Sequence, residues 1–426
     1  MSAAGHRISA AAFATLATGT GTGGAAAVAE LCAAQASKHR LLARFLVDET
    51  RRIGHRDAAL VSAAYETLSE LEERFPEQVD RCLRYPVTGA WLLRTCRALP
   101  GGSPGELAAL ALAAAVRAGA PCRLRVPASD GMLMLPTLGL VTLPGGLPEV
   151  TEVAVEPASG GAELRAGRHK IDISPVRDGP GWQVLHQVPG TPGLSLTIDD
   201  LDPCRWPGDD VDGRLTDERR ERWFACARGA WEVLTGRHPA VAAELGAAVS
   251  VLTPVLAGER DQHSASARDA FGAIALSDPL DGIGMAVTLA HELQHAKLNA
   301  LSEVVELVRP DDGRRYYAPW RPDPRPLFGL LHGAYAHAAV AGFWRVHAAD
   351  TGIGPRAQVE FARWREASYQ VCATLLGSGG LTPAGEELVG ELRGLLGRWR
   401  AEPVTPAAAA RAGLLSERHR RQTRLR

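Results

Sequence analysis

Hydrophobic residues recur at different spacings along the chain. In residues 1–120, alanine and leucine recur at helical spacing, which predicts helices over Ala25–Leu46, Asp57–Phe75 and Gly105–Ala118. In residues 121–203, short runs rich in Val, Leu, Ile and Thr lie between Gly and Pro, as is typical of strands joined by turns. Helical spacing returns in residues 204–426. We therefore expect a mainly helical α+β fold in three parts: an N-terminal helical region, a β-rich section and a C-terminal domain.

The expected strands are short and bounded by turn residues. In the β-rich section they are Leu124–Val126, Met132–Leu135, Leu140–Leu143, Glu152–Val155, Ile171–Ile173, Trp182–Val188 and Leu194–Ile198. Two more, Val249–Leu256 and Ala270–Leu276, follow helices expected at Trp223–Leu234 and Ala240–Ala247. Ala270–Leu276 has the character of an edge strand that pairs with an extended peptide.

Three glycines near the N-terminus fit a weak motif. Gly19, Gly21 and Gly24 have the spacing G-x-G-x-x-G of a dinucleotide-binding loop. That loop follows a strand, whereas these glycines join two helix-like segments. We interpret them as a flexible connector.

The pentapeptide His291-Glu292-Leu293-Gln294-His295 carries the clearest chemical signal in the chain. It is an HExxH motif within a segment of helical spacing. Residues four apart project from one face of a helix, so His291 and His295 can present two imidazole nitrogens to one metal ion, with Glu292 beside them. Two ligands do not hold a catalytic metal, so a third must come from elsewhere in the chain.

The helix that contains this motif is expected to be long and buried. Ser277-Asp278-Pro279 supplies a capping residue and a first-turn proline, and apolar residues continue to Leu307 before Arg309-Pro310 ends the helix. Burying two histidines, a glutamate and a glutamine is costly unless something pairs with them. A metal ion would offset that cost, whereas a solvent-exposed polar stripe fits poorly with such apolar flanks.

Spacing favours His332 as the third ligand. Glu303 and Glu306 would lie about 12 and 16 Å along the axis from His295 if the helix continues, which is too far to share an ion. A second helix, expected from Leu327 to about Ala349, carries His332 and His337, which point in different directions because they are five residues apart. His332 lies among small residues (Gly329, Gly333 and Ala336) that would allow a close approach to the HExxH helix, so we choose it.

Two metals remain open for a site of three histidines. Zinc would make Glu292 the base that takes a proton from metal-bound water in peptide hydrolysis. Ferrous iron with 2-oxoglutarate would instead need an arginine for the far carboxylate of the cosubstrate, since arginine binds carboxylates in a bidentate manner. Arg321, Arg325 and Arg345 are close enough in sequence to the second helix to be candidates.

Composition restricts the class of protein. The 426 residues are 46% hydrophobic and 22% charged, enough for a substantial core, and the formal net charge of −1 gives no global attraction to nucleic acid or anionic membranes. Seven dispersed cysteines without a C-x-x-C pair are the usage of a reduced, intracellular protein. No apolar run approaches the roughly 18 residues of a membrane span. We expect a cytoplasmic protein with no nucleic-acid or membrane partner.

Several segments together resemble a known family. They are His291–Leu298 with Ala300-Leu301, then Trp320-Arg321-Pro322-Asp323-Pro324-Arg325-Pro326, and then Leu331-His332-Gly333-Ala334-Tyr335-Ala336-His337. They are similar to the HExxH-type peptide-modification proteins of ribosomal peptide natural product pathways, which are described as 2-oxoglutarate-dependent peptide β-hydroxylases. The similarity extends upstream through Leu194–Pro203 and Phe271-Gly272 and so covers the C-terminal half or somewhat more.

This resemblance implies iron rather than zinc. It implies His291, His295 and His332 as the ligands, with Glu292 a structural group beside the metal, and hydroxylation at a side-chain β-carbon of a precursor peptide. It does not identify the arginine that binds 2-oxoglutarate. The leading expectation is therefore an Fe(II)/2-oxoglutarate peptide hydroxylase on a zincin-like catalytic domain (residues 204–426). The alternatives are a zinc metallopeptidase that uses Glu292 as its base, and an inactive peptide-binding scaffold.

Overall fold

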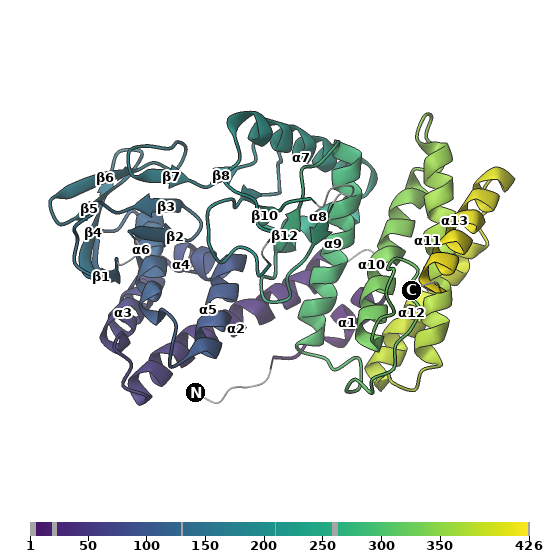
Figure 1. Ribbon diagram of the computed structural model, residues 1–426, viewed down its shortest axis with the longest axis horizontal. Coiled ribbons are helices and arrows are strands. Elements are labelled where there is room, and N and C mark those ends of the chain that lie inside the picture. The colour runs from purple at the N-terminus through teal and green to yellow at the C-terminus, as the bar shows by residue number, and fades with distance from the viewer. Residues whose placement is uncertain (1–5, 19–23, 129–130, 209, 258–262, 425–426) are drawn as a thin grey trace. The chain divides into compact units, whose positions relative to one another are not determined.

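The computed structural model describes residues 6–18, 24–128, 131–208, 210–257 and 263–424 (Figure 1). The chain divides into two compact units, and each is discontinuous in sequence. The helical unit comprises Met1–Ala34, Ala225–Ala248 and Pro279–Arg426, and the β-containing unit comprises Gln35–Phe224 and Val249–Asp278. The fold is mixed α+β and mainly helical, as the sequence predicts.

This division differs from the three consecutive segments that hydrophobic spacing suggests. Residues 1–34 belong with the HExxH helix, and residues 249–278 belong with the strands of the β-rich section. The boundary between the units passes through two helices, α2 (Gly24–Arg52) and α7 (Asp217–Arg237). Contacts between residues far apart in sequence create both units, and periodicity along the chain does not report such contacts.

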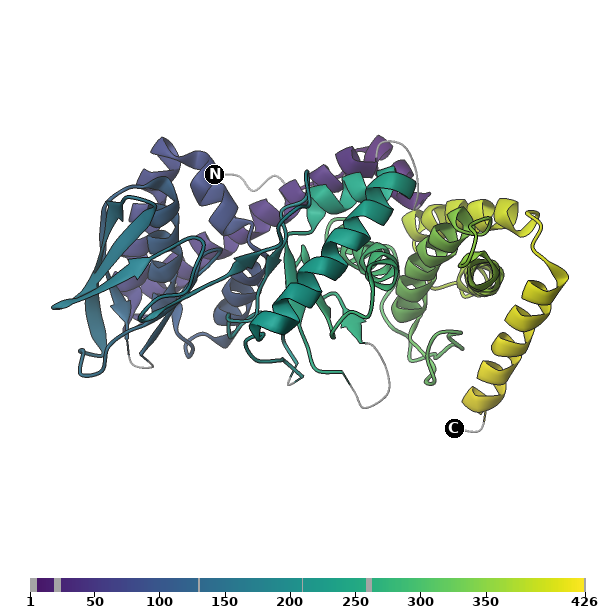
Figure 2. The same cartoon turned by 90° about the horizontal axis from the view of Figure 1, so that it is seen from above.

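The β-containing unit is built around a buried helix, α6 (Leu107–Ala118). Every residue from Leu107 to Ala115 is buried, because α6 packs against α3 (Ala58–Arg74) on one side and against strands on another. Figures 1 and 2 both show these helices beside the strands. The remaining helices that lie wholly within this unit are α4 (Pro76–Leu83), α5 (Pro86–Ala98) and the short 3₁₀ turn η1 (Pro104–Glu106).

Three sheets belong to this unit. The first is antiparallel, in the order β1-β4-β5-β6, and the second is antiparallel, in the order β2-β3-β7. The third is mixed, in the order β11-β12-β10-β9-β8. The strands are β1 (Cys122–Pro127), β2 (Met132–Leu135), β3 (Gly139–Thr142), β4 (Val150–Ala158), β5 (Gly161–Ala166), β6 (His169–Ile173), β7 (Trp182–Val184), β8 (His186–Gln187), β9 (Thr197–Ile198), β10 (Val251–Pro254), β11 (Ser264–Ala265) and β12 (Ala273–Leu276).

The prediction that Ala270–Leu276 forms an edge strand is wrong. β12 lies inside the mixed sheet, parallel to β10 on one side and antiparallel to the two-residue β11 on the other. Both of its neighbours come from the same unit, and β11 covers Ala275 and Leu276 on the second side. The open edges of the sheets lie elsewhere, β2 among them.

The helical unit places the HExxH helix, α9 (Gly282–Ser302), against α10 (Leu327–Val346). α10 in turn packs against α11 (Gly354–Leu376), and α11 packs against α12 (Pro383–Arg400) and α13 (Pro406–Arg424). The remaining helices that lie wholly within this unit are α1 (Ala10–Ala17) and α8 (Pro239–Ala248). α10 is buried along most of its length, which fits its central position in this packing.

The bounds of α9 differ from the prediction at both ends. Its N-cap is Asp281, whose carboxylate accepts a hydrogen bond from the Gly284 N–H, and not Ser277 or Asp278. The helix ends at Ser302, about one turn before Leu307, because the backbone beyond it pairs with a distant segment. The Thr382 hydroxyl donates to the Glu306 carbonyl, and the Thr382 N–H donates to the Leu307 carbonyl. Glu303 and Glu306 therefore lie beyond the end of the helix, so the axial distances expected for a continuing helix do not exclude them as ligands.

The glycine motif lies mostly outside the described residues, since only Gly24 is described. Gly24 opens α2, and a Cβ at this position would lie 1.8 Å from Glu244 Oε1. Packing against Glu244 therefore accounts for a glycine here. Within the described part of the chain, none of the helices combines the length and apolar character that crossing a membrane requires.

Candidate metal centre

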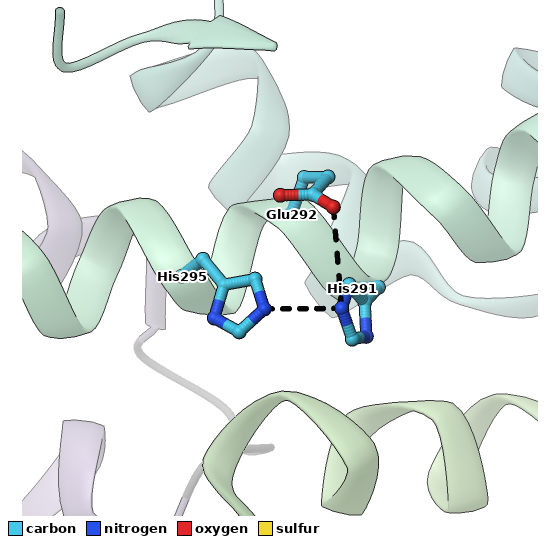
Figure 3. A group of neighbouring side chains, drawn as sticks. All are labelled: His291, Glu292 and His295. Carbon is cyan, nitrogen blue, oxygen red and sulfur yellow. Dashed lines mark hydrogen bonds and ion pairs between the residues drawn. The ribbon is translucent and has the colours of Figure 1, made fainter. Parts of the chain in front are cut away.

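α9 brings His291 and His295 together. Their Nε2 atoms lie 3.0 Å apart, and Figure 3 shows the two rings on the same side of the helix. Two imidazole nitrogens that bind one ion with bonds of about 2.0–2.1 Å are separated by roughly 2.9–3.4 Å at angles between 90° and tetrahedral. The observed separation is therefore compatible with two ligands of a single metal ion.

Glu292 completes the only group of three such ligand atoms found among the described residues. Ligand atoms of His291, Glu292 and His295 all lie within 4.8 Å of one another. Glu292 is 1% exposed, and its Oε1 lies 3.9 Å from His291 Nε2. This carboxylate is close enough to influence the site, either as a base or as a group that holds the rings in place.

His332 lies against His295 but outside that group. The two rings stack with centroids 4.1 Å apart. The Nε2 of His332 lies 3.1 Å from Asn299 Oδ1, and since an amide oxygen only accepts, Nε2–H is the donor and Nδ1 keeps the lone pair. A third ligand from this ring would therefore bind through Nδ1 while Asn299 holds the other nitrogen.

His337 is the fourth histidine of the cluster. Its ring lies edge-on to His291, with centroids 4.9 Å apart, and it stacks on Trp320 and contacts Trp364. Its Nδ1–H donates to the Gly333 carbonyl at 2.9 Å, which leaves a lone pair on Nε2. A backbone carbonyl often fixes a metal-binding histidine in this way, so the geometry keeps His337 as an alternative to His332.

Burial keeps these rings neutral. It lowers the pKa of His291 and His332 to about 4, and it lowers the pKa of His295 and His337 well below the ordinary value of 6.5. Neighbouring histidines lower the pKa of His291, His295 and His337 further, and Arg325 lowers that of His332. Neutral imidazole is the form that binds metal ions.

One buried atom of the cluster has no hydrogen-bond partner in the described residues. This atom is Nδ1 of His295. Such an unpartnered polar atom costs about 1–3 kcal/mol, and a bound ion or water often accounts for one. The short Nε2–Nε2 distance and the neutral rings fit a metal centre at the Nε2 atoms, whereas Nδ1 is the other nitrogen of the same ring and cannot bind the same ion.

The candidate arginines differ in their distance from the cluster. Arg325 lies over the first turn of α10, where a Cβ on Gly329 would be 3.3 Å from its Nε, and its charge reaches His332. Arg321 pairs with Asp323, as Arg325 also does. Arg345 lies 13 residues beyond His332 on α10, about 20 Å along the axis, and it pairs with Glu402. The structure therefore brings Arg325 to the histidines and leaves Arg345 far from them.

The small residues of α10 have a different role from the one the sequence suggests. A Cβ on Gly333 would lie 2.2 Å from the Trp320 ring, and Gly329 faces Arg325. These glycines therefore make room for the connector before α10. Gly380 lies outside α10. A Cβ on it would be 2.5 Å from Leu327 Cδ2, so this glycine makes room for the first residue of the helix.

Sequence reasoning missed two residues of the cluster. Asn299 follows His295 by four residues, as His295 follows His291, so the helical spacing that identified the histidines also marks Asn299. Trp364 belongs to α11 and is brought to His337 only by folding, and its sequence context carries no comparable signal.

Comparison with known proteins does not identify a relative: neither a family model nor a curated protein matches this chain.

Proposed function

We propose that this protein is a non-haem iron, 2-oxoglutarate-dependent hydroxylase that acts on a side-chain β-carbon of a ribosomally made precursor peptide. The observation that carries a metal-dependent activity is the His291–His295 pair, with Nε2 atoms 3.0 Å apart within a cluster of neutral, buried imidazoles. The choice of iron and of a peptide substrate depends on the motif resemblance. A zincin-like arrangement of residues 204–426 is part of the same proposal.

The residues have distinct roles in this proposal. His291, His295 and His332 hold the iron, and Arg325 binds the far carboxylate of 2-oxoglutarate. Bound iron supplies the oxygen chemistry, in which one atom of dioxygen enters the C–H bond of the peptide and the other enters succinate as carbon dioxide leaves. Trp320 and Trp364 exclude water from the side of the cluster formed by His337.

A zinc metallopeptidase is the second candidate, and the position of Glu292 favours it. The carboxylate lies 3.9 Å from His291 Nε2, within one water molecule of a metal bound there. In this reaction Glu292 takes a proton from water as the peptide bond breaks. A catalytically inactive scaffold that binds peptides is the third candidate, since the cluster would also stabilise α9 against α10.

One assay separates these candidates. Purified protein is loaded with Fe(II) or Zn(II) and incubated with 2-oxoglutarate, oxygen and a candidate precursor peptide, and succinate and peptide mass are measured. Succinate that requires iron, with a peptide gain of one oxygen atom, supports the hydroxylase. Cleavage that persists without 2-oxoglutarate supports the peptidase. Peptide binding with neither product, retained in His291→Ala, supports the scaffold.

Glu292→Gln provides a second comparison in the same assay. The amide keeps the size of the side chain but cannot accept a proton as a carboxylate does. A peptidase should lose about 10²–10⁴-fold in turnover, whereas a hydroxylase should keep a larger share because its reaction needs no base at this position.

A further inference from the structure

The open edge of β2 presents unpaired backbone groups. β2 pairs with β3 so that Leu133 is opposite Val141 and Leu135 is opposite Gly139. The Leu143 N–H donates to the Gly131 carbonyl, which fixes alternate residues as the hydrogen-bonded pairs of this antiparallel ladder. The N–H and C=O groups of Met132 and Met134 therefore point away from β3, and in the described residues no hydrogen bond from another element reaches them.

A pocket of about 210 Å³ adjoins this edge. Met132, Leu133 and Met134 line one side, and the apolar side chains of α5 and α6 line another. Its volume is below the roughly 300–1,000 Å³ of sites for drug-sized ligands, so it suits one side chain. Methionine side chains adapt readily to different apolar groups.

The charged residues that line the pocket are acidic. Glu106 and Asp202 line it, and none of the described residues that line it is a lysine, arginine or histidine. Asp202 is 7% exposed, and its Oδ1 accepts a hydrogen bond from the Cys204 N–H. Its other carboxyl oxygen has no hydrogen-bond partner among the described residues. The pocket thus holds a buried acid that forms no ion pair with any residue the structure describes.

The charge of Arg205 lowers the pKa of Asp202, but its guanidinium does not pair with the carboxylate. Arg205 uses its guanidinium to donate to the backbone carbonyls of Asp202 and Asp212. Burial, together with the neighbouring Asp199, raises the pKa of Asp202 to about 8. Ionising this carboxyl is therefore unfavourable in the protein alone, and a cation placed beside it would reverse that preference.

We propose that β2 binds an extended peptide that pairs with Met132 and Met134 and inserts a lysine or arginine side chain into this pocket. Strand addition supplies affinity through main-chain hydrogen bonds, and a neighbouring pocket supplies specificity through one side chain. The acidic lining selects a basic residue, and the apolar walls accept its aliphatic stem. This inference rests on the proposed function in one respect: the peptide that binds at β2 is taken to be the substrate of the proposed hydroxylase.

The test measures binding to the full-length protein by fluorescence anisotropy. The probe is a fluorescein-labelled peptide of sequence Thr-Val-Lys-Val-Thr-Val, compared with peptides that carry norleucine or glutamate in place of lysine. We expect the lysine peptide to bind about tenfold tighter than the norleucine peptide, the fold-change of a hydrogen bond to a charged group, and the glutamate peptide to bind weakest. Equal affinity for all three would overturn the assignment of the pocket.

Two substitutions separate the strand from the pocket. Met134→Pro removes an outward N–H that β3 does not use and should weaken every peptide about fivefold or more, and Met134→Leu, which keeps that N–H and an apolar side chain, should weaken them less. Asp202→Asn, which resembles the protonated acid, should bind the lysine and norleucine peptides equally. Circular dichroism and unfolding midpoints establish that each variant is folded.

A modified peptide tests strand pairing without altering the protein. N-methylation of the residues that flank the lysine blocks main-chain pairing and should weaken binding as Met134→Pro does. Unchanged binding of the methylated peptide overturns the proposal even if Met134→Pro fails to fold. Neither iron nor 2-oxoglutarate is present in these assays, so their failure leaves the hydroxylase proposal standing, and a failure of turnover leaves the docking site standing.

Discussion

The imidazole rings of His295 and His332 lie face to face, with centroids 4.1 Å apart and planes only 10° from parallel. An imidazole binds a metal ion through a lone pair in the plane of its ring, so stacked rings hold their lone pairs in two separate, nearly parallel planes. Both rings can reach one ion only if at least one of them rotates. Metal binding at this cluster should therefore change the side-chain arrangement of His295 or of His332.

His332→Ala tests whether this residue is the third ligand. We expect the variant to lose iron during gel filtration. Its affinity for iron should fall by more than the roughly 10–100-fold seen when a residue that hydrogen-bonds to a metal ligand is removed. His337→Ala should retain the metal, because its ring contributes packing between Trp320 and Trp364. Metal content by elemental analysis measures both, and loss of iron from His337→Ala alone would exchange the two assignments.

Arg325→Gln tests the binding of 2-oxoglutarate. The guanidinium lies close enough to His332 to lower its pKa, and it is the candidate arginine nearest the cluster. We expect the KM for 2-oxoglutarate to rise about tenfold or more, since a charged hydrogen bond contributes about 1.5–3 kcal/mol. Arg321→Gln is the matched control, because it removes the other arginine that pairs with Asp323. A larger effect in the control would move the assignment to Arg321.

Local patterns in the sequence predicted local features of the structure. The HExxH helix and its burial follow from apolar residues at helical spacing, and strands such as β2 follow from short apolar runs between turns. β5 has the alternation of a strand, with Ala162, Leu164 and Ala166 buried between Glu163 and Arg165, but it was missed because alanines supply two of its three buried side chains and give a weak apolar signal. Its position follows from pairing with β4 and β6.

Features that depend on distant contacts were not predictable in this way. α9 ends early because Thr382, 80 residues beyond Ser302, takes the carbonyls of Glu306 and Leu307. Gly333 is glycine because Trp320 occupies the space of its Cβ. A single sequence shows which residue types are present at these positions but not which of them meet.

Lys297 forms a buried ion pair that explains its place two residues after the HExxH motif. Its Nζ lies 2.7 Å from Glu244 Oε2, and the two side chains are 2% and 5% exposed. Lys297→Met should lower the free energy of unfolding by about 3–5 kcal/mol, because it leaves Glu244 buried without its cation. Denaturant titration measures this change.

The double variant Lys297→Met/Glu244→Leu separates the pair from its surroundings. Replacing both charges by apolar groups removes the unpaired acid and should recover most of the lost stability. If the double variant is as unstable as Lys297→Met, the ion pair itself stabilises the protein more than burial of its parts costs. Metal content should remain unchanged in both variants.

Gly333→Ala tests the packing of Trp320 on the cluster. A Cβ here would lie 2.2 Å from the indole, so the ring must move, and overpacking of this kind costs about 1–3 kcal/mol. Gly390→Ala in α12 is the control, since nothing lies within 4 Å of its Cβ and the better helix propensity should add up to about 1 kcal/mol. Unfolding monitored by tryptophan fluorescence gives the free energy of unfolding of both variants. If Gly333→Ala is stabilised as much as Gly390→Ala, Trp320 moves aside without cost.

A second pair of histidines should make stability depend on pH independently of the metal. His238 Nε2 lies 3.0 Å from His347 Nε2, and burial, followed by the nearby His347 and Arg237, lowers the pKa of His238 to about 4. The unfolded chain takes up this proton near its ordinary pKa of 6.5, and the folded protein does so only near 4, so stability falls as the pH drops through this window. Between pH 7.5 and 5 the loss from this group is about 2 kcal/mol.

His238→Gln removes the titrating group, so the unfolding free energy of this variant should fall by about 2 kcal/mol less than that of the parent over the same range. Identical pH dependence in the two proteins would show that His238 titrates alike in the folded and unfolded states.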